Sequence, residues 1–143
     1  PYDAVDPIPV ACEAVTALQG FIARRVPFFD SAILSVTSIH AGTAYNIVPD
    51  TVELKGTLRT LSDERRAEGK AAFERIVRQV AAAHECEADV RIDEGYPATR
   101  NDSRAVDLVR EVATDLFGAE AYHEMPTPIM GGEDFAYVLQ EIP

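Results

Sequence analysis

The segment TVELKGTLRT, residues 51–60, alternates apolar and polar side chains along most of its length. Its apolar positions are Val52, Leu54 and Leu58, and the polar positions between and beside them are Glu53, Lys55, Thr57 and Arg59. Successive side chains of a strand point to opposite faces, so this period of two predicts a β-strand with one buried and one solvated face.

A second strand is predicted just upstream, over residues 31–40, which are rich in Ile, Val and Thr. The two strands are joined by HAGTAYNIVPD, residues 40–50, in which Gly42, Asn46 and Pro49 are typical turn residues. This connection is longer than a tight hairpin requires, and long loops of this kind are often functional.

Two amphipathic helices are predicted beside the strands. The first begins at Asp6-Pro7, because Asp suits the N-cap and Pro the first helical position, and it is expected to run to about Arg25. Ser62 is expected to cap the second. The predicted buried stripes are Val10, Ala11, Ala14, Val15, Leu18 and Ile22 in the first helix, and Phe73, Ile76, Val77, Val80 and Ala81 in the second.

A third strand is predicted over residues 86–93, where apolar residues from Cys86 to Ile92 alternate with charged ones. The resulting order is helix–strand–strand–helix–strand. Since each strand has one apolar face, both helices are expected to cover the same face of an antiparallel sheet. One further strand before Pro1 would complete a βαββαβ unit of the ferredoxin-like type, an α+β fold.

The pattern breaks at Gly95, and the rest of the chain is predicted to be helical. A third helix is expected to begin after Asn101 or Asp102 and to end at Gly118, and a fourth is expected after Gly131-Gly132. These helices carry apolar stripes but no strand accompanies them. They are therefore interpreted as a piece of a second domain.

The composition is globular, with 47% hydrophobic residues and no apolar run long enough to span a membrane. The net charge of −11 repels phosphate backbones and gives no attraction to an anionic surface, so neither nucleic acid nor membrane is an expected partner. Cys12 and Cys86 form no CxxC pair. These features favour a soluble, cytoplasmic protein, and a first residue Pro1 in place of Met suggests that the chain starts inside a longer one.

No local pattern of the chain builds a catalytic or metal site. The 3 histidines have no HxH or HExxH spacing, and neither a GxSxG motif nor a Gly-rich phosphate loop occurs. Taken alone, Arg59 is most simply a solvated residue paired with Glu53 or another neighbour, and Asn46 a turn residue. Glu133 is most simply part of a helix start, although the glycines before it also allow a ligand to approach the backbone.

Five stretches form a more specific combination: PYDAVDPI, VTALQGFIARRV, HAGTAYNIVPDTVELKGTLRTL, GYPATRND and PIMGGEDFAYVLQEIP. In this order they resemble the M20 family of metallopeptidases. Within it, the chain resembles the amidohydrolase branch of hippurate hydrolases, N-acyl-amino-acid hydrolases and auxin-conjugate hydrolases. The resemblance covers nearly the whole chain, and GTAYNIVPD, GTLRTL and GGEDFAY are specific in combination.

The resemblance implies a catalytic α/β domain with a two-metal site and an inserted βαββαβ lid that often forms the dimer contact. Residues 1–94 would be most of the lid, and residues 95–143 the start of the returning catalytic domain. The segments that carry the family's metal ligands, and the lid's own His-Ala-Ala segment, have no counterpart here, and Tyr2 stands where relatives commonly carry His. The chain alone is therefore expected to bind no metal and to be inactive.

Three residues match substrate-contacting positions of that family. Asn46, in AYNIVPD, resembles the lid asparagine that hydrogen-bonds the substrate. Arg59, in GTLR, resembles the lid arginine that holds the substrate carboxylate, a role that suits the bidentate guanidinium fork. Glu133, in GGEDF, resembles a residue near the metal site.

The activity implied for the intact protein is hydrolysis of the amide bond of N-acyl amino acids, hippurate-like or related conjugates. Two divalent metal ions (Zn, Mn, Co or Ni) would activate a water, and closure of a dimeric lid would bring Asn46 and Arg59 to the substrate. The rival hypothesis is a non-catalytic dimerisation or binding module, because a βαββαβ sheet with an open edge can pair with a copy of itself.

Overall fold

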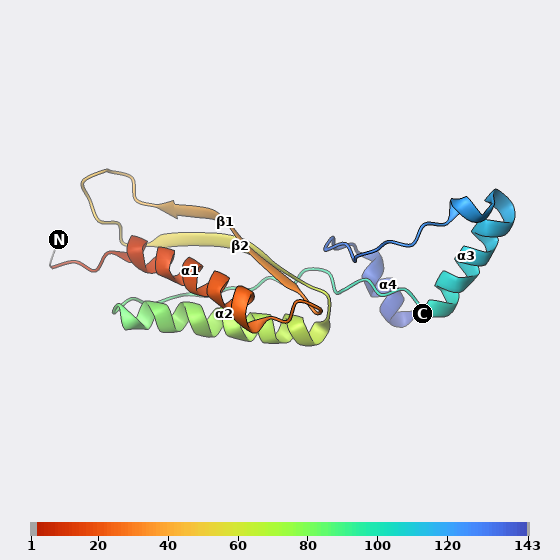
Figure 1. Ribbon diagram of the computed structural model, residues 1–143. Coiled ribbons are helices and arrows are strands. Elements are labelled where there is room, and N and C mark those ends of the chain that lie inside the picture. The colour runs from red at the N-terminus through yellow and green to blue at the C-terminus, as the bar shows by residue number, and fades with distance from the viewer. Residues whose placement is uncertain (1–2, 143) are drawn as a thin grey trace. The chain divides into compact units, whose positions relative to one another are not determined.

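A long antiparallel hairpin organises the first part of the chain (Figure 1). In the computed structural model, which describes residues 3–142, strand β1 spans Ala32–Ala41 and strand β2 spans Val52–Thr60. The register places Leu34 opposite Leu58 and Ile33 opposite Arg59. Both predicted strands are confirmed, together with their antiparallel pairing.

The hairpin is irregular at its centre, where the register shifts between Val36 and Ser38. Gly56 lies opposite Val36, and a Cβ atom on Gly56 would come within 2.3 Å of the carbonyl oxygen of Ser35. That distance is far inside van der Waals contact, so this position of β2 requires glycine. A bulge of this kind bends the strand and increases its twist.

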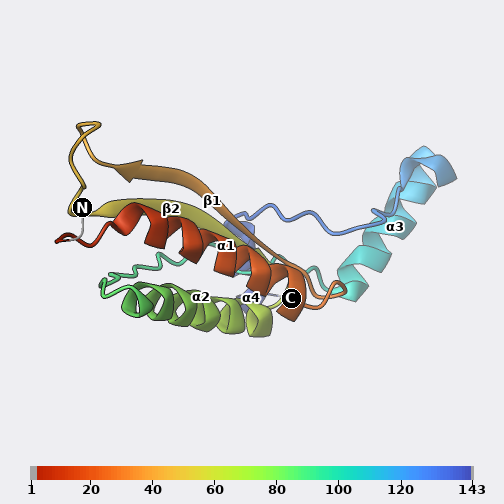
Figure 2. The same ribbon diagram turned by 60° about the vertical axis from the view of Figure 1, so that its left-hand side comes forward.

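Two helices cover the same face of the hairpin (Figures 1 and 2). Helix α1 spans Pro7–Arg25 and helix α2 spans Asp63–Ala83. The predicted caps are confirmed: the Asp6 carboxylate accepts from the Ile8 amide at 3.0 Å, and the Ser62 hydroxyl accepts from the Arg65 amide at 3.1 Å. Each bond satisfies one of the amides that a helix start leaves without an intrahelical partner.

The core lies between these helices and the hairpin. Leu18 of α1 is the most deeply buried large side chain, at 1% exposure. Helix α2 approaches β2 closely because it presents small residues there: Gly69 and Ala72 are buried, and a Cβ atom on Gly69 would lie 3.0 Å from Cδ2 of Leu58. The buried positions of this unit are Val10, Ala14, Leu18, Ala32, Leu34, Gly69, Ala72 and Ala81.

The predicted third strand over residues 86–93 is wrong as a secondary-structure assignment. The segment is extended and its burial alternates, but among the described residues only β1 and β2 form a sheet. It is held to α2 instead, since the Cys86 amide donates to the Ala81 carbonyl at 2.9 Å and Arg78 Nη1 donates to the Ala88 carbonyl at 2.9 Å. Alternation of side chains specifies an extended backbone, whereas a strand also needs a neighbouring backbone to bond.

The chain divides into two compact units at residues 93 and 94; we call them unit 1 and unit 2 in chain order. Unit 2 contains α3 (Ser103–Phe117), a short 3-10 helix (Ala119–Ala121) and α4 (Phe135–Glu141). The N-cap of α3 is Asp102, one of the two predicted candidates, and Gly118 follows its last turn with a φ of 91°. The predicted helices of this part are thus confirmed.

Candidate functional site

The loop between the two strands, residues 42–51, forms one end of unit 1. It encloses a hollow of about 600 Å³ together with the start of α1. Gly42 has a φ of +65°, which favours glycine, and Pro49 packs 3.8 Å from where its Cβ would lie. The hollow is lined by Asp6, Ile8, the last β1 residue Ala41 and the loop residues Gly42, Thr43, Ala44, Tyr45, Asn46, Ile47, Val48 and Pro49.

Asn46 lies in this loop with its side chain exposed. Its neighbours in sequence are also exposed: Tyr45 is 104% and Ile47 is 67% exposed. A backbone hydrogen bond of 3.5 Å from the Ile47 amide to the Ala44 carbonyl closes a turn around Asn46. The structure therefore presents the Asn46 amide group at the tip of a defined loop rather than buried inside it.

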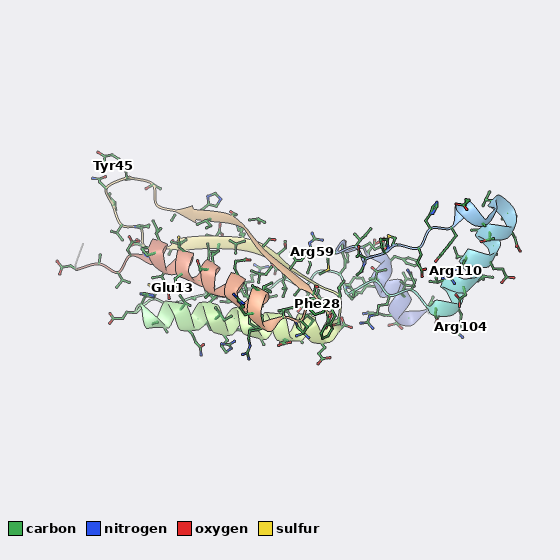
Figure 3. The ribbon with its side chains drawn as sticks, viewed as in Figure 1. Glu13, Phe28, Tyr45, Arg59, Arg104 and Arg110 are labelled. Carbon is green, nitrogen blue, oxygen red and sulfur yellow. The ribbon has the colours of Figure 1, made fainter. Side chains whose placement is uncertain are left out.

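Arg59 lies near the opposite end of β2 from this loop (Figure 3). It is exposed and is paired in register with Ile33, whereas the adjacent Leu58 faces helix α2. The carboxylate of Glu53, the partner considered for Arg59 from the sequence, binds Lys55 Nζ at 2.9 Å. Arg59 thus lies on the face of the hairpin opposite to α1 and α2.

Asn46 and Arg59 are not brought together by unit 1. Strand β2 is 9 residues long, and at roughly 3.3 Å per residue its ends are about 25 Å apart. An N-acyl amino acid is no longer than about three extended residues, roughly 10 Å. Figure 3 shows the same separation, with Tyr45 at the tip of the loop and Arg59 towards the other end of the hairpin.

A polar cluster that sequence patterns did not reveal fixes the Arg59 end of the hairpin. The Asp30 carboxylate accepts from the Ser62 hydroxyl at 2.9 Å and from Arg65 Nε at 3.4 Å. Asp30 precedes β1 and the other two lie at the start of α2, so the cluster ties these segments together. Ser62 was predicted as a helix cap, but its bond to Asp30 depends on a contact across 32 residues that no local pattern announces.

Glu133 belongs to unit 2, where it lies exposed just before α4. Its carbonyl accepts from the Ala136 amide at 3.3 Å. The preceding Gly132 packs against Tyr96, whose ring contacts that of Tyr137 edge-on, with centroids 6.0 Å apart. These aromatic contacts hold the Gly-Gly-Glu segment within unit 2.

Asp102, the N-cap of α3, is an acidic side chain whose pKa departs from its ordinary value. The hydrogen bond from the Arg104 side chain, aided by the amides of Arg104 and Ala105, holds the pKa of Asp102 below its ordinary value of 3.8. This pairing stabilises the charged form of a helix cap and is structural in kind. His84, which ends α2, has its Nε2 2.7 Å from a carboxylate oxygen of Glu13.

Within the described residues, no three side chains of His, Cys, Asp or Glu gather closely enough to hold a metal ion. Tyr2, predicted to stand where relatives carry His, lies outside the described residues. None of the helices found between Asp3 and Ile142 combines the length and apolar composition needed to cross a bilayer.

The chain thus combines an antiparallel hairpin covered by two helices with a second, helical unit. The chain belongs to the M20 peptidases: the sequence pattern of Peptidase family M20/M25/M40 matches residues 9–143. The resemblance drawn from the sequence motifs is thereby confirmed.

Individual relatives support the same assignment. The chain is 38% identical to N-acetyl-L-cysteine deacetylase of Bacillus subtilis, over all of this chain and 34% of the relative. It is 34% identical to hippurate hydrolase of Campylobacter jejuni, over 96% of this chain and 36% of the relative.

A solved structure also has this fold. The YXEP protein of Bacillus subtilis, a dinuclear metal-binding peptidase from the M20 family, superposes with a TM-score of 0.81 at 28% identity. The superposition covers 99% of this chain and 36% of that protein. The chain thus spans about a third of the length of the relatives that it matches.

Proposed function

We propose that this chain is part of an amidohydrolase that cleaves the amide bond of N-acyl amino acids. The supporting observation is the exposed Arg59 of strand β2, in a chain that belongs to the M20 family. A planar guanidinium can bind both oxygens of a carboxylate, the one charged group that every N-acyl amino acid carries. Asn46 and Glu133 are proposed as further substrate-contacting residues.

Unit 1 is proposed to be the ferredoxin-like lid of this enzyme. In support, its order is helix–strand–strand–helix, and the extended segment over residues 86–93 lies along α2 as a further strand of such a unit would. In the βαββαβ arrangement the last strand pairs with the first strand of the unit. Among the described residues only β1 and β2 form a sheet, so the segment over residues 86–93 has no such partner there.

Two divalent metal ions are proposed as the cofactor of the whole enzyme, in line with the dinuclear metal-binding relative. Because the described residues form no metal centre, the ions would be held by residues outside this chain. The contribution of this chain is to bind and orient the substrate. Arg59 would hold the carboxylate, and Asn46 would offer a neutral hydrogen-bonding amide.

The separation of Asn46 and Arg59 bears on whether the enzyme works as a dimer. One small substrate cannot touch both residues of the same chain, because roughly 25 Å of strand lies between them. We therefore propose a homodimer in which Asn46 of one chain and Arg59 of the other serve the same site. The family resemblance implied only that lid closure brings both residues to the substrate; here they are proposed to come from different chains.

The test of the proposed function is Arg59→Ala in the enzyme that contains this chain. Loss of a charge-assisted pair in a desolvated site, worth about 2–5 kcal/mol, is expected to lower kcat/KM on an N-acyl amino acid by roughly thirty-fold or more. Arg59→Lys is expected to recover only part. A substrate whose carboxylate is converted to a neutral amide should be nearly insensitive to both changes.

Lys55→Ala is the matched control, since Lys55 is another exposed cation of β2 and forms only a surface ion pair with Glu53. Its kinetics are expected to stay near those of the wild type. Unchanged kcat/KM for Arg59→Ala on the acid substrate would refute the carboxylate role. Absence of any amidase activity in the whole protein would instead favour the non-catalytic dimerisation module.

A further inference from the structure

The tip of the 42–51 loop combines side chains in a way that the proposed role of Asn46 does not explain. Asn46 is flanked by two large side chains that lie open to solvent, Tyr45 at 104% and Ile47 at 67% exposure. A single exposed apolar residue is ordinary, but two of them around one polar group have the composition of a ligand-binding surface. Both residues belong to the turn that the Ile47–Ala44 backbone hydrogen bond closes.

The charges around this loop indicate which end of a substrate it suits. Of the described residues that line the 600 Å³ hollow, Asp6 alone is charged, and Asp50 alone is charged among those that line the adjoining hollow of about 350 Å³. Both are acidic, so a carboxylate placed here would meet repulsion at a distance shorter than the screening length of physiological salt. A neutral apolar group meets no such penalty.

From this arrangement we infer that Tyr45, supported by Ile47, contacts the acyl group of the substrate and so determines acyl specificity. The inference rests on the proposed function, in which the carboxylate at the amino-acid end of the substrate goes to Arg59. The uncharged acyl end is then the part that reaches the acidic, aromatic loop of the second chain. Its preferred occupant is an aromatic acyl group, which can stack on the Tyr45 ring or meet it edge-on.

The experiment compares N-benzoylglycine with N-acetylglycine, which differ only in the acyl group, as substrates of the metal-loaded enzyme. Tyr45→Ala is expected to lower kcat/KM about ten-fold on the benzoyl substrate and less than about two-fold on the acetyl substrate. Tyr45→Phe, which keeps the ring, is expected to stay within about two-fold of the wild type on both. Thermal melting of each variant should match the wild type, because Tyr45 makes no buried contact.

Phe117→Ala is the control for loss of an exposed aromatic ring, since Phe117 is 78% exposed and is the last residue of α3 in unit 2. It should change neither substrate's kcat/KM. Equal losses on both acyl groups for Tyr45→Ala, or a loss that follows the amino-acid side chain instead of the acyl group, would overturn the inference alone. A wild-type enzyme that hydrolyses neither substrate would overturn the proposed function and the inference with it.

Discussion

Unit 1 and unit 2 bury their apolar side chains to very different extents. Unit 1 has a core between its two helices and the hairpin, in which Leu18 is 1% and Leu34 is 8% exposed. In unit 2 the only buried positions among the described residues are Pro97 and Ala136, and α3 has none. Its apolar side chains instead face solvent: Leu108, Val109, Val112, Leu116 and Phe117 are 46–78% exposed.

This difference shows which of the two units contains a packed apolar core. A helix in a protein is stabilised mainly by packing its amphipathic face, and α3 finds no such packing among the described residues of unit 2. The hairpin of unit 1, in contrast, packs against α1 and α2. The 42–51 loop and Arg59 therefore belong to the unit that has a packed core.

The largest expected effect contrasts one leucine from each unit. Leu18→Ala removes a fully buried side chain and is expected to destabilise unit 1 by about 2–5 kcal/mol. Leu116→Ala, at a position that is 68% exposed, is expected to change stability by less than about 0.5 kcal/mol. Urea unfolding of this chain, followed by circular dichroism, measures both, and comparable losses for the two would show that the contrast between the units is wrong.

A second pair of variants tests how closely the two strands of unit 1 approach each other at Gly56. Gly56→Ala forces a Cβ atom to 2.3 Å from the Ser35 carbonyl oxygen and is expected to cost about 1–3 kcal/mol. Gly20→Ala places a Cβ in open space on helix α1 and is expected to stabilise by about 0.5–1 kcal/mol. Melting temperatures that move in the same direction for both variants would refute the close approach of the strands at Gly56.

The smallest expected effect concerns the start of α3 in unit 2. Because the hydrogen bond from Arg104 lowers the pKa of Asp102 in the folded chain, the cap stabilises α3 above the ordinary pKa of 3.8 and this contribution is lost as pH falls through the lower, folded value. The amide NMR signals of Arg104 and Ala105 should titrate with a midpoint below 3.8. In Asp102→Asn, which keeps an acceptor, this titration should vanish; a midpoint above 3.8 in the wild type would contradict the pairing.

Most of the secondary structure could be predicted from the sequence because its signals are local. The Asp6 and Ser62 caps and the alternation of residues 51–60 each depend on neighbours within a few positions. The segment over residues 86–93 failed for the opposite reason, since its strand character depends on a partner backbone. The need for glycine at position 56 likewise arises from a contact across the hairpin.

The residues proposed for the candidate site came from sequence motifs, whereas their arrangement in space could not be read from the sequence. The motifs named Asn46 and Arg59, and the structure places both on exposed surfaces. Their separation by nearly the whole length of β2 follows from the register of the hairpin. The Asp30 cluster, which fixes the Arg59 end, depends on long-range contacts with Ser62 and Arg65 and left no recognisable sequence signal.

If Asn46 and Arg59 of different chains complete one site, two enzyme variants that each lack one of these residues should complement each other in a mixed dimer. Asn46→Ala and Arg59→Ala are each expected to have strongly reduced activity. After denaturation and refolding of an equal mixture, half of the dimers should be mixed, and each mixed dimer should hold one complete site out of two. About a quarter of the wild-type activity is therefore expected to return. If the two residues act within the same chain, no mixed dimer has a complete site, and activity that stays at the level of the separate variants would contradict the account.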